Sequence, residues 1–186
     1  MRPALANLPV HDGVKTSKSA VSVEEFLDHA EMLTANLLAF EARRCFALTL
    51  DGLFERQLKI WVMAHLAKAE LARVARAEFV PLLYEAGFRH GLDLQTGAVG
   101  TTIEELHLLG SVVPHGDGSS LTKLRNRAPH LWRYANSFAA TLSEEHAILS
   151  ETIEVSDGDF ARYMRAVTRF WGLADREPGA VVDVPY

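Results

Sequence analysis

The sequence predicts an all-α protein, folded as a single up-and-down bundle of four to five main helices. Its long segments carry apolar residues at steps of three and four, the spacing that places them on one face of a helix. The chain has 186 residues, of which 48% are hydrophobic and 23% charged, as in ordinary globular proteins. A chain of this length can bury one core without a disulfide or a structural metal.

Two long helices are predicted in the first half of the chain. Ser22 and Glu25 form a capping box at the start of the first helix, which covers about 23–43. Its apolar stripe consists of Phe26, Ala30, Leu33, Leu37 and Phe40. The second helix covers about 53–78, where Ala, Leu and Arg are frequent and Gly and Pro are absent. Gly52, between the two, is either a break or a tolerated glycine.

Two shorter helices are predicted in the middle of the chain. Pro81 suits the first turn of one of them, which ends near Gly87 or Gly91. A glycine-containing loop then leads to the other, which begins near Thr101 and stops at Pro114. Its first turn is expected to hold two acidic residues, Glu104 and Glu105, which suit the helix dipole there.

Two more helices are predicted in the last third. One of the serines in Ser119-Ser120 can cap a short helix that runs to about Arg127. The final helix covers about 157–172 and is amphipathic. Ser156 and Asp159 open it, because a hydroxyl and a carboxylate at this spacing can each satisfy a free backbone N–H.

One helical domain is predicted over 22–174, between a flexible N-terminal arm (1–21) and a C-terminal tail (175–186). The arm lacks the apolar core of a secretory signal, and the longest apolar stretch, 60–67, is too short to cross a bilayer. We therefore expect a cytoplasmic protein that does not bind a membrane, and no cofactor is indicated. The lone Cys45 excludes a disulfide framework and a zinc ribbon built on several thiols.

The charge of the chain is unevenly distributed. The net charge of −5 and the isoelectric point of about 5.9 exclude a protein coated in basic charge, such as a histone-like DNA binder. Residues 119–142, however, contain no Asp or Glu and carry +4, which leaves −9 for the rest of the chain. The basic residues of this stretch are Lys123, Arg125, Arg127 and Arg133. They predict either a surface that binds the phosphates of single-stranded RNA or a solvated helix face that pairs with the acidic remainder.

Arg125, Asn126 and His130 are the first candidate for chemistry. An Arg and a His separated by four residues can approach one phosphate from a helix or a helical turn. The guanidinium would neutralise the phosphoryl oxygens. The imidazole, with an ordinary pKa of about 6.5, could move the proton of a ribose 2′-hydroxyl or of the leaving oxygen. Such chemistry needs no metal.

The second candidate is the string His115-Gly116-Asp117-Gly118-Ser119. Two glycines around Asp117 give a tight loop, and the helix after it presents free N–H groups to an anion. His115 would then lie at a phosphate-handling site, assisted by Ser119. Alternatively, Asp117 and Ser119 only cap the turn and the helix. A third alternative is a metal site that combines His107, His115 and Asp117, although no metal is part of the leading prediction.

Several stretches of the sequence carry a family resemblance. They are Phe54-Glu55-Arg56-Gln57-Leu58, Glu104-Glu105-Leu106-His107-Leu108-Leu109, the segment 113–120, the spaced Leu124, Pro129, Leu131 and Trp132, and Phe170-Trp171. Over about 24–173 the chain resembles the HEPN superfamily, the higher eukaryotes and prokaryotes nucleotide-binding helical domain. The resemblance implies an up-and-down bundle of four to five helices that usually dimerises, with an Arg/His site facing the dimer cleft.

The resemblance also implies a site. Many members that this chain resembles are metal-independent endoribonucleases of toxin–antitoxin, abortive-infection or other defence systems, and others are non-catalytic RNA-binding or interaction modules. The family motif is an Arg followed, after four to six residues, by a His. Arg125 and His130 match this motif, with Asn126 as the polar residue after the Arg. His115 matches the His-Gly ending of the family motif.

Two functions follow from these observations. The first is a HEPN-like protein that binds RNA or nucleotide phosphate and could act as an endoribonuclease, with His115 or His130 as acid/base and Arg125 as phosphate clamp. Further phosphate contacts would come from Asn126, Arg127, Lys123, Arg133, Ser119 and Asp117. The second is a non-catalytic dimeric interaction module with a degenerate site. The expected partners are single-stranded RNA, a second copy of the chain and a cognate antitoxin.

Overall fold

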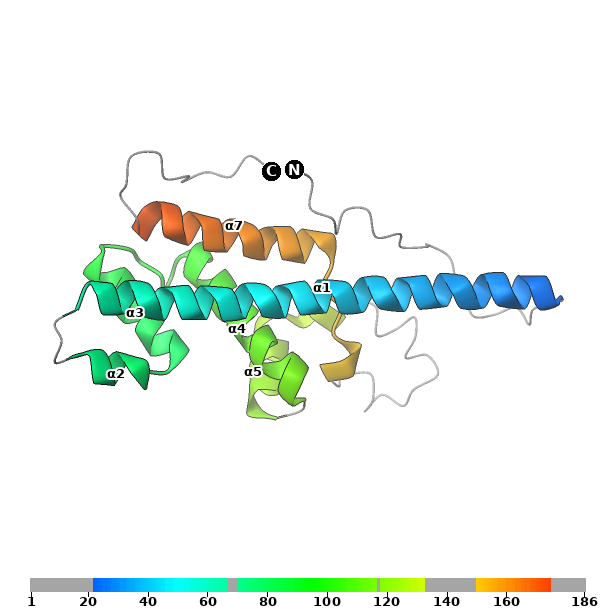
Figure 1. Cartoon of the computed structure of the whole chain (residues 1–186), viewed down its shortest axis with the longest axis horizontal. Coiled ribbons are helices and arrows are strands. Elements are labelled where there is room, and N and C mark those ends of the chain that lie inside the picture. Colours follow the sequence, from blue (N-terminus) through cyan, green and yellow to red (C-terminus); the bar gives the residue numbers. More distant parts are fainter. Residues whose placement is uncertain (1–21, 67–69, 117, 133–149, 175–186) are drawn as a thin grey trace.

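The computed structural model describes four stretches of the chain, residues 22–66, 70–116, 118–132 and 150–174 (Figure 1). Within them there are six α-helices, two short 3₁₀ turns and no strand, so the all-α prediction is confirmed. The predicted N-terminal arm and C-terminal tail lie outside the described residues.

α1 is a single helix of 42 residues, Val23–Ala64, roughly 63 Å long at 1.5 Å per residue. It begins as predicted, because the hydroxyl of Ser22 accepts a hydrogen bond from the N–H of Glu25 at 3.1 Å. At its other end Nδ1 of His65 donates to the carbonyl oxygen of Trp61 at 2.8 Å. This bond satisfies one of the carbonyls that the last turn of a helix leaves free.

The two helices predicted over 23–43 and 53–78 are wrong in their boundaries. Gly52 lies inside α1, is exposed, and has no atom within 4 Å of the position that a Cβ would take. A glycine in such a place costs about 1 kcal/mol relative to alanine, which a long helix with a packed stripe tolerates. Past the end of α1, the predicted second helix is replaced by the short α2 (Leu71–Ala75).

The remaining elements are shorter than α1. They are α3 (Phe79–Arg89), α4 (Ala98–His115), α5 (Ser119–Arg127), the 3₁₀ turns η3 (Pro129–Trp132) and η6 (Ser150–Thr152), and α7 (Asp157–Ala174). α4 begins before Thr101 and, against the prediction, includes Pro114. Pro114 is in the last turn, so its missing N–H removes only one helical hydrogen bond. Gly116, at φ 72°, then ends the helix, and its N–H donates to the carbonyl of Val112 at 2.8 Å.

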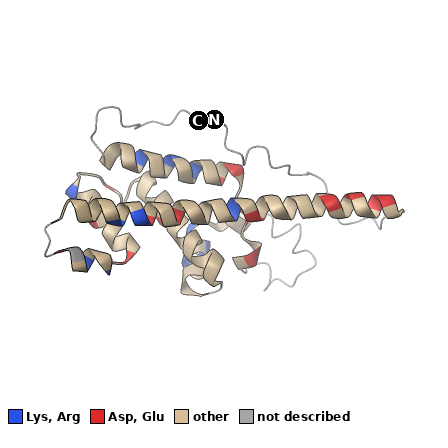
Figure 2. Ribbon diagram, viewed as in Figure 1, with Lys and Arg blue, Asp and Glu red and all other residues tan. Residues whose placement is uncertain are grey.

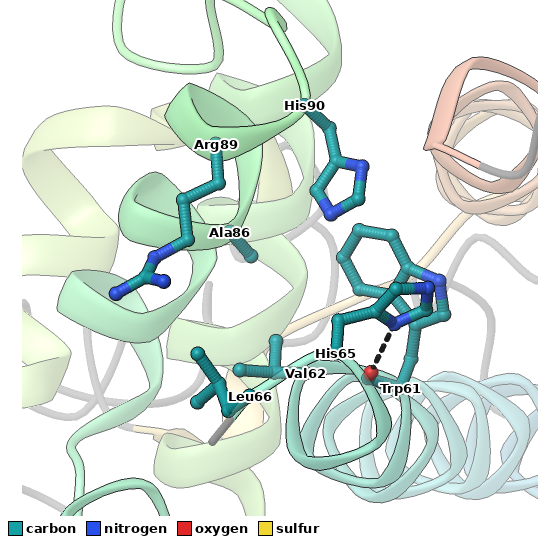
Figure 3. A pocket seen from close by; sticks show the side chains of 7 residues that line it. All are labelled: Trp61, Val62, His65, Leu66, Ala86, Arg89 and His90. Carbon is teal, nitrogen blue, oxygen red and sulfur yellow. Dashed lines mark hydrogen bonds between the residues drawn. The ribbon is translucent and has the colours of Figure 1, made fainter. Parts of the chain in front are cut away.

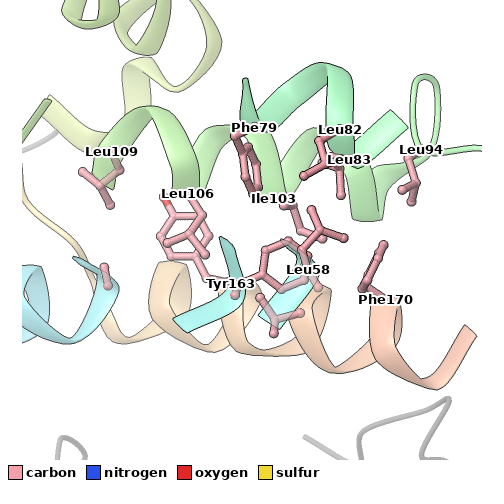
Figure 4. Close-up of a cluster of buried hydrophobic side chains, with 14 of the residues drawn as sticks. Leu58, Phe79, Leu82, Leu83, Leu94, Ile103, Leu106, Leu109, Tyr163 and Phe170 are labelled. Atoms are coloured by element: carbon pink, nitrogen blue, oxygen red, sulfur yellow. The ribbon is translucent and has the colours of Figure 1, made fainter. Parts of the chain in front are cut away.

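α4 lies at the centre of the bundle, packed against α1, α5 and α7 (Figure 1). The most completely buried side chains come from five helices and include Phe54, Leu58, Leu82, Leu83, Ile103, Leu106, Leu109, Leu124, Tyr163 and Phe170 (Figure 4). Phe54 and Phe170 meet edge to face with ring centroids 5.1 Å apart, an arrangement that aromatic pairs favour. Because α4 contacts so many neighbours, polar side chains on it are held in defined positions.

The N-terminal part of α1 extends beyond the bundle (Figure 1). Of residues 23–40, which we call the overhang, only Ala39 is buried. Its exposed large apolar side chains are Val23, Phe26, Leu27, Leu37 and Leu38. Despite these side chains, neither α1 nor any other described helix is long and apolar enough to cross a lipid bilayer.

Candidate phosphate-binding and acid–base site

Two adjacent glutamates of α4 anchor the segment that follows it. Glu104 and Glu105 are only 7% and 5% exposed. The expectation that they occupy the first turn is wrong, because α4 begins earlier, at Ala98. Glu104 is paired with the guanidinium of Arg127, the last residue of α5. The two carboxylates therefore serve as buried charge partners and not as complements of the helix dipole.

Glu105 is the centre of a polar cluster that joins α4, η3 and α7. It accepts hydrogen bonds from Nη1 of Arg162 at 3.1 Å and from the hydroxyl of Tyr163 at 2.7 Å. Nε2 of His130 lies 3.5 Å from Oε1 of Glu105 and 3.2 Å from Nη2 of Arg162. The same Nε2 lies 3.3 Å from Oδ1 of Asp159. We call these five residues the His130 cluster.

The start of α7 positions the carboxylate of Asp159. As predicted, Ser156 and Asp159 form a reciprocal capping box: the N–H of Ser156 donates to Oδ2 of Asp159 at 3.1 Å, and the N–H of Asp159 donates to Oγ of Ser156 at 3.1 Å. Asp159 is 5% exposed, and its other oxygen faces His130. A motif that starts a helix therefore also fixes a negative charge beside the imidazole.

The tautomer of His130 decides which of these neighbours its Nε2 binds. A guanidinium can only donate, so Nε2 accepts from Arg162 when it carries no proton. A proton on Nε2 would instead face the carboxylates of Glu105 and Asp159. Burial alone would lower the pKa of Arg162, but the hydrogen bond and charge of Glu105 raise it above its usual value. Burial and the charge of Glu105 raise the pKa of Tyr163, which keeps its hydroxyl as a donor.

α5 carries three further polar residues whose side chains are exposed to solvent. Lys123, Arg125 and Asn126 are exposed, and none of the hydrogen bonds or ion pairs between described residues involves them. Arg127 differs, because Glu104 neutralises its charge. The guanidinium that contacts His130 belongs to Arg162 and not to Arg125. α5 thus carries two cations, Lys123 and Arg125, that no described residue pairs with. His130 instead contacts Arg162, which belongs to α7.

His115 and Ser119 border the link between α4 and α5. His115 is the last residue of α4 and is exposed. Ser119 is the first residue of α5 and is also exposed, whereas Gly118 occupies the N-cap, so the predicted serine cap is wrong. Asp117 and Arg133 lie outside the described residues.

His107 belongs to a second polar contact, between α1 and α4. Its Nδ1 lies 3.3 Å from Oδ1 of the buried Asp51, and its ring stacks on Phe79 with centroids 4.0 Å apart. Burial raises the pKa of Asp51 although the bond to His107 opposes this shift. Gly110 provides the space, since a Cβ there would overlap the carboxylate of Asp51. The described part of the chain contains no group of three or more His, Cys, Asp or Glu side chains that could hold a metal ion.

A cavity of about 370 Å³ lies between the C-terminal end of α1 and α3 (Figure 3). Trp61 and His90 both line it, and their rings contact each other with centroids 4.3 Å apart. Arg89, at its rim, is bound by the carboxylate of Glu85 at 2.7 Å. None of the residues predicted for a site lines this cavity, so it is separate from the His130 cluster.

Sequence reasoning missed four members of the His130 cluster, namely Glu105, Asp159, Arg162 and Tyr163. No pattern in the sequence marks Glu105 as buried, because it lies off the helix face that Ile103 and Leu106 share. Asp159 and Arg162 are three residues apart and therefore lie on one face of their helix. Nothing in the sequence pairs that face with His130.

The chain matches no family model, and no curated protein or solved structure is significantly similar to it. The HEPN resemblance therefore stays a prediction. Function has to be argued from the charges and contacts described above.

Proposed function

We propose that this chain is a HEPN-like helical protein that binds single-stranded RNA through α5. One observation carries the proposal: Lys123, Arg125 and Asn126 are exposed on one short helix, and no described carboxylate pairs with them. Residues 119–142 contain no acid, whereas the rest of the chain is acidic. A guanidinium, an ammonium and an amide are the groups that hold phosphate and sugar oxygens.

The proposal predicts a defined dependence on salt. Affinity for a single strand falls with salt by a logarithmic slope of about 0.7 per neutralised phosphate. Arg125→Ala should therefore weaken binding and lower this slope by about 0.7. Arg56→Ala is the matched control, because Arg56 is also an exposed arginine but lies on α1. Fluorescence anisotropy with a labelled single-stranded RNA measures both quantities between 50 and 200 mM salt, roughly the range over which such contacts are lost. Absence of binding at the lowest salt, or an equal effect of Arg56→Ala, would refute RNA binding by α5.

RNA cleavage without a metal is the catalytic form of the same proposal. The observation that favours it is a histidine held beside a guanidinium and two carboxylates, with His130 and Arg162 still about one-third exposed. In such a step a base removes the proton of a ribose 2′-hydroxyl, and the 2′-oxygen attacks phosphorus. The bond to the 5′-oxygen then breaks, and an acid protonates this oxygen. The products are a 2′,3′-cyclic phosphate and a 5′-hydroxyl.

Either His130 or His115 would move these protons, and Arg125 would bind the phosphate with Asn126 beside it. His115 has the more open position, at the end of α4, while His130 lies 3.5 Å and 3.3 Å from the carboxylates of Glu105 and Asp159. The test is cleavage of single-stranded RNA in EDTA by His115→Ala and His130→Ala, with His29→Ala on the overhang as control. Circular dichroism checks that each variant is folded.

Loss of cleavage in one of the two variants would identify the acting histidine. Cleavage that survives both substitutions, or that is absent from the wild type, would sink the ribonuclease proposal. Binding without cleavage would leave RNA binding alone as the function. For a toxin of this kind, the protein partner would be a cognate antitoxin that covers α5.

A further inference from the structure

The overhang of α1 carries the pattern of a coiled-coil seam. Apolar residues follow one another at steps of three and four without a gap, at Val23, Phe26, Ala30, Leu33, Leu37 and Phe40. This is the heptad spacing with which one helix packs along another. The same spacing continues into the bundle, where the residues on this face are Arg44, Ala47, Asp51, Phe54 and Leu58, all of them buried.

The two halves of this stripe differ in what covers them, and the buried half also includes two charged residues, Arg44 and Asp51. Leu58 is 0% exposed under α4 and α7, whereas Phe26 is 62% and Leu37 55% exposed on the overhang. A helical segment of this length with one small buried side chain, Ala39, is marginal in water by itself, since helices in proteins draw most of their stability from packing. Among the described residues, nothing buries the large seam side chains Phe26 and Leu37, although the sequence of the overhang is patterned for a packing partner.

The charges of the overhang indicate what that partner is. All its charged residues are acidic, and the first Lys or Arg of α1 is Arg43 (Figure 2). In heptad terms the acids occupy outward-facing positions, at Glu24, Glu25, Asp28 and Glu31. The positions that flank the seam are neutral, at Leu27, His29, Thr34 and Asn36. A second copy of the overhang would thus bring no like charges together along the seam. A basic partner helix would have no acidic residues to pair with there, so the charges favour a second copy of this chain.

The bundle determines the direction of pairing. Beyond the overhang, α4 and α7 already cover the face of α1 that carries the stripe (Figure 1). A partner helix in parallel orientation would continue along that face and collide with them. A partner in antiparallel orientation leads away from the bundle. We propose that two copies of this chain dimerise through antiparallel overhangs, with Val23 opposite Phe40, Phe26 opposite Leu37, and Ala30 opposite Leu33 of the second copy.

This inference goes beyond RNA binding and is tested on the full chain without RNA. Leu37→Glu places a charge in the seam of both copies, so we expect the dimer dissociation constant to rise roughly a hundredfold. Leu38→Glu is the matched control. It is the same substitution one residue further along, at a leucine that is 66% exposed but lies off the seam, and it should leave dimerisation within about twofold of wild type. Light scattering coupled to size exclusion, and analytical ultracentrifugation, measure the mass.

A monomeric wild type would overturn the proposal, and so would equal effects of the two substitutions. Orientation is tested by disulfide formation in a Cys45→Ser background. When Phe26→Cys and Leu37→Cys proteins are mixed and oxidised, antiparallel pairing gives the mixed dimer. Efficient cross-linking of Leu37→Cys protein to itself would show parallel pairing and refute the arrangement. Unchanged helix content by circular dichroism shows that a monomeric variant is folded.

Discussion

Glu154 lies between η6 and α7, where its N–H donates to the carbonyl of Leu131 at 2.9 Å. Oε2 of its side chain is buried and has no hydrogen-bond partner in the described part of the chain. Burial raises the pKa of the Glu154 carboxyl from 4.5 to about 7, because the charged form loses hydration and gains no partner. A glutamine at this position cannot ionise. We therefore predict that Glu154→Gln removes the loss of folding stability that the buried charge causes in the wild type at neutral and alkaline pH.

The sign and size of this cost follow from the two pKa values. Below pH 4.5 the carboxyl is protonated in the folded and the unfolded chain, so it does not affect stability. Between pH 4.5 and pH 7 the Glu154 carboxyl is ionised in the unfolded chain but still largely protonated in the folded chain. The folded state is therefore destabilised as the pH rises through this range. The full shift corresponds to about 3 kcal/mol. Glu154 is only partly buried, so solvent screening reduces the expected cost to about 1–2 kcal/mol above pH 7.

Urea unfolding at pH 5 and pH 8 tests this prediction. From pH 5 to pH 8 the wild type should lose about 1–2 kcal/mol more than Glu154→Gln. A constant offset between the two proteins does not matter, because only the change with pH is compared. Glu151→Gln, at an exposed position in η6, is the control and should follow the wild type. Parallel pH profiles for wild type and Glu154→Gln would refute the reasoning.

Three further substitutions test the packing. Gly110→Ala would place a Cβ against the carboxylate of Asp51 and should lower the free energy of unfolding by at least about 2 kcal/mol. A neutral effect in thermal denaturation would contradict the close packing of α1 on α4. Tyr163→Phe removes the donor 2.7 Å from Glu105 and should cost about 1–2 kcal/mol in urea unfolding, and a gain in stability would contradict this. Phe170→Ala empties a fully buried site beside three aromatic rings and should cost about 3–5 kcal/mol, with a loss below 1 kcal/mol as the contrary result.

Hydrophobic spacing was sufficient to predict the helical class, and turn residues were sufficient to predict the end of α5 at Arg127, because both depend on local signals. It failed where packing between helices overrode the helix-breaking tendency of a single glycine or proline. Gly52 was consistent with a break or with a tolerated glycine, and packing of α1 against the bundle on both sides of Gly52 keeps the helix continuous. Pro114 looked like a stop, but a proline in the last turn removes only one hydrogen bond.

The candidate site, like the fold, could be predicted only in part from the sequence. The acid-free stretch around Lys123 and Arg125 can be read directly from the sequence, since charge composition needs no fold. The partners of His130 cannot, because Glu105 and Arg162 are 25 and 32 residues away from it along the chain. Only the packing of α4 against α7 brings these groups together. The roles of His115 and His130 in RNA chemistry stay predictions until the proposed variants are measured.

The order of the helices along the chain has a consequence for synthesis on the ribosome. α1 is made first, yet the helices that cover its stripe, α4 and α7, begin only at Ala98 and Asp157. At translation rates of about 5–20 residues per second, roughly 5–20 s pass between the completion of α1 and the start of α7. During this time Phe54 and Leu58 have no complete core to enter, so the nascent chain exposes an apolar helix that chaperones could bind and that could aggregate.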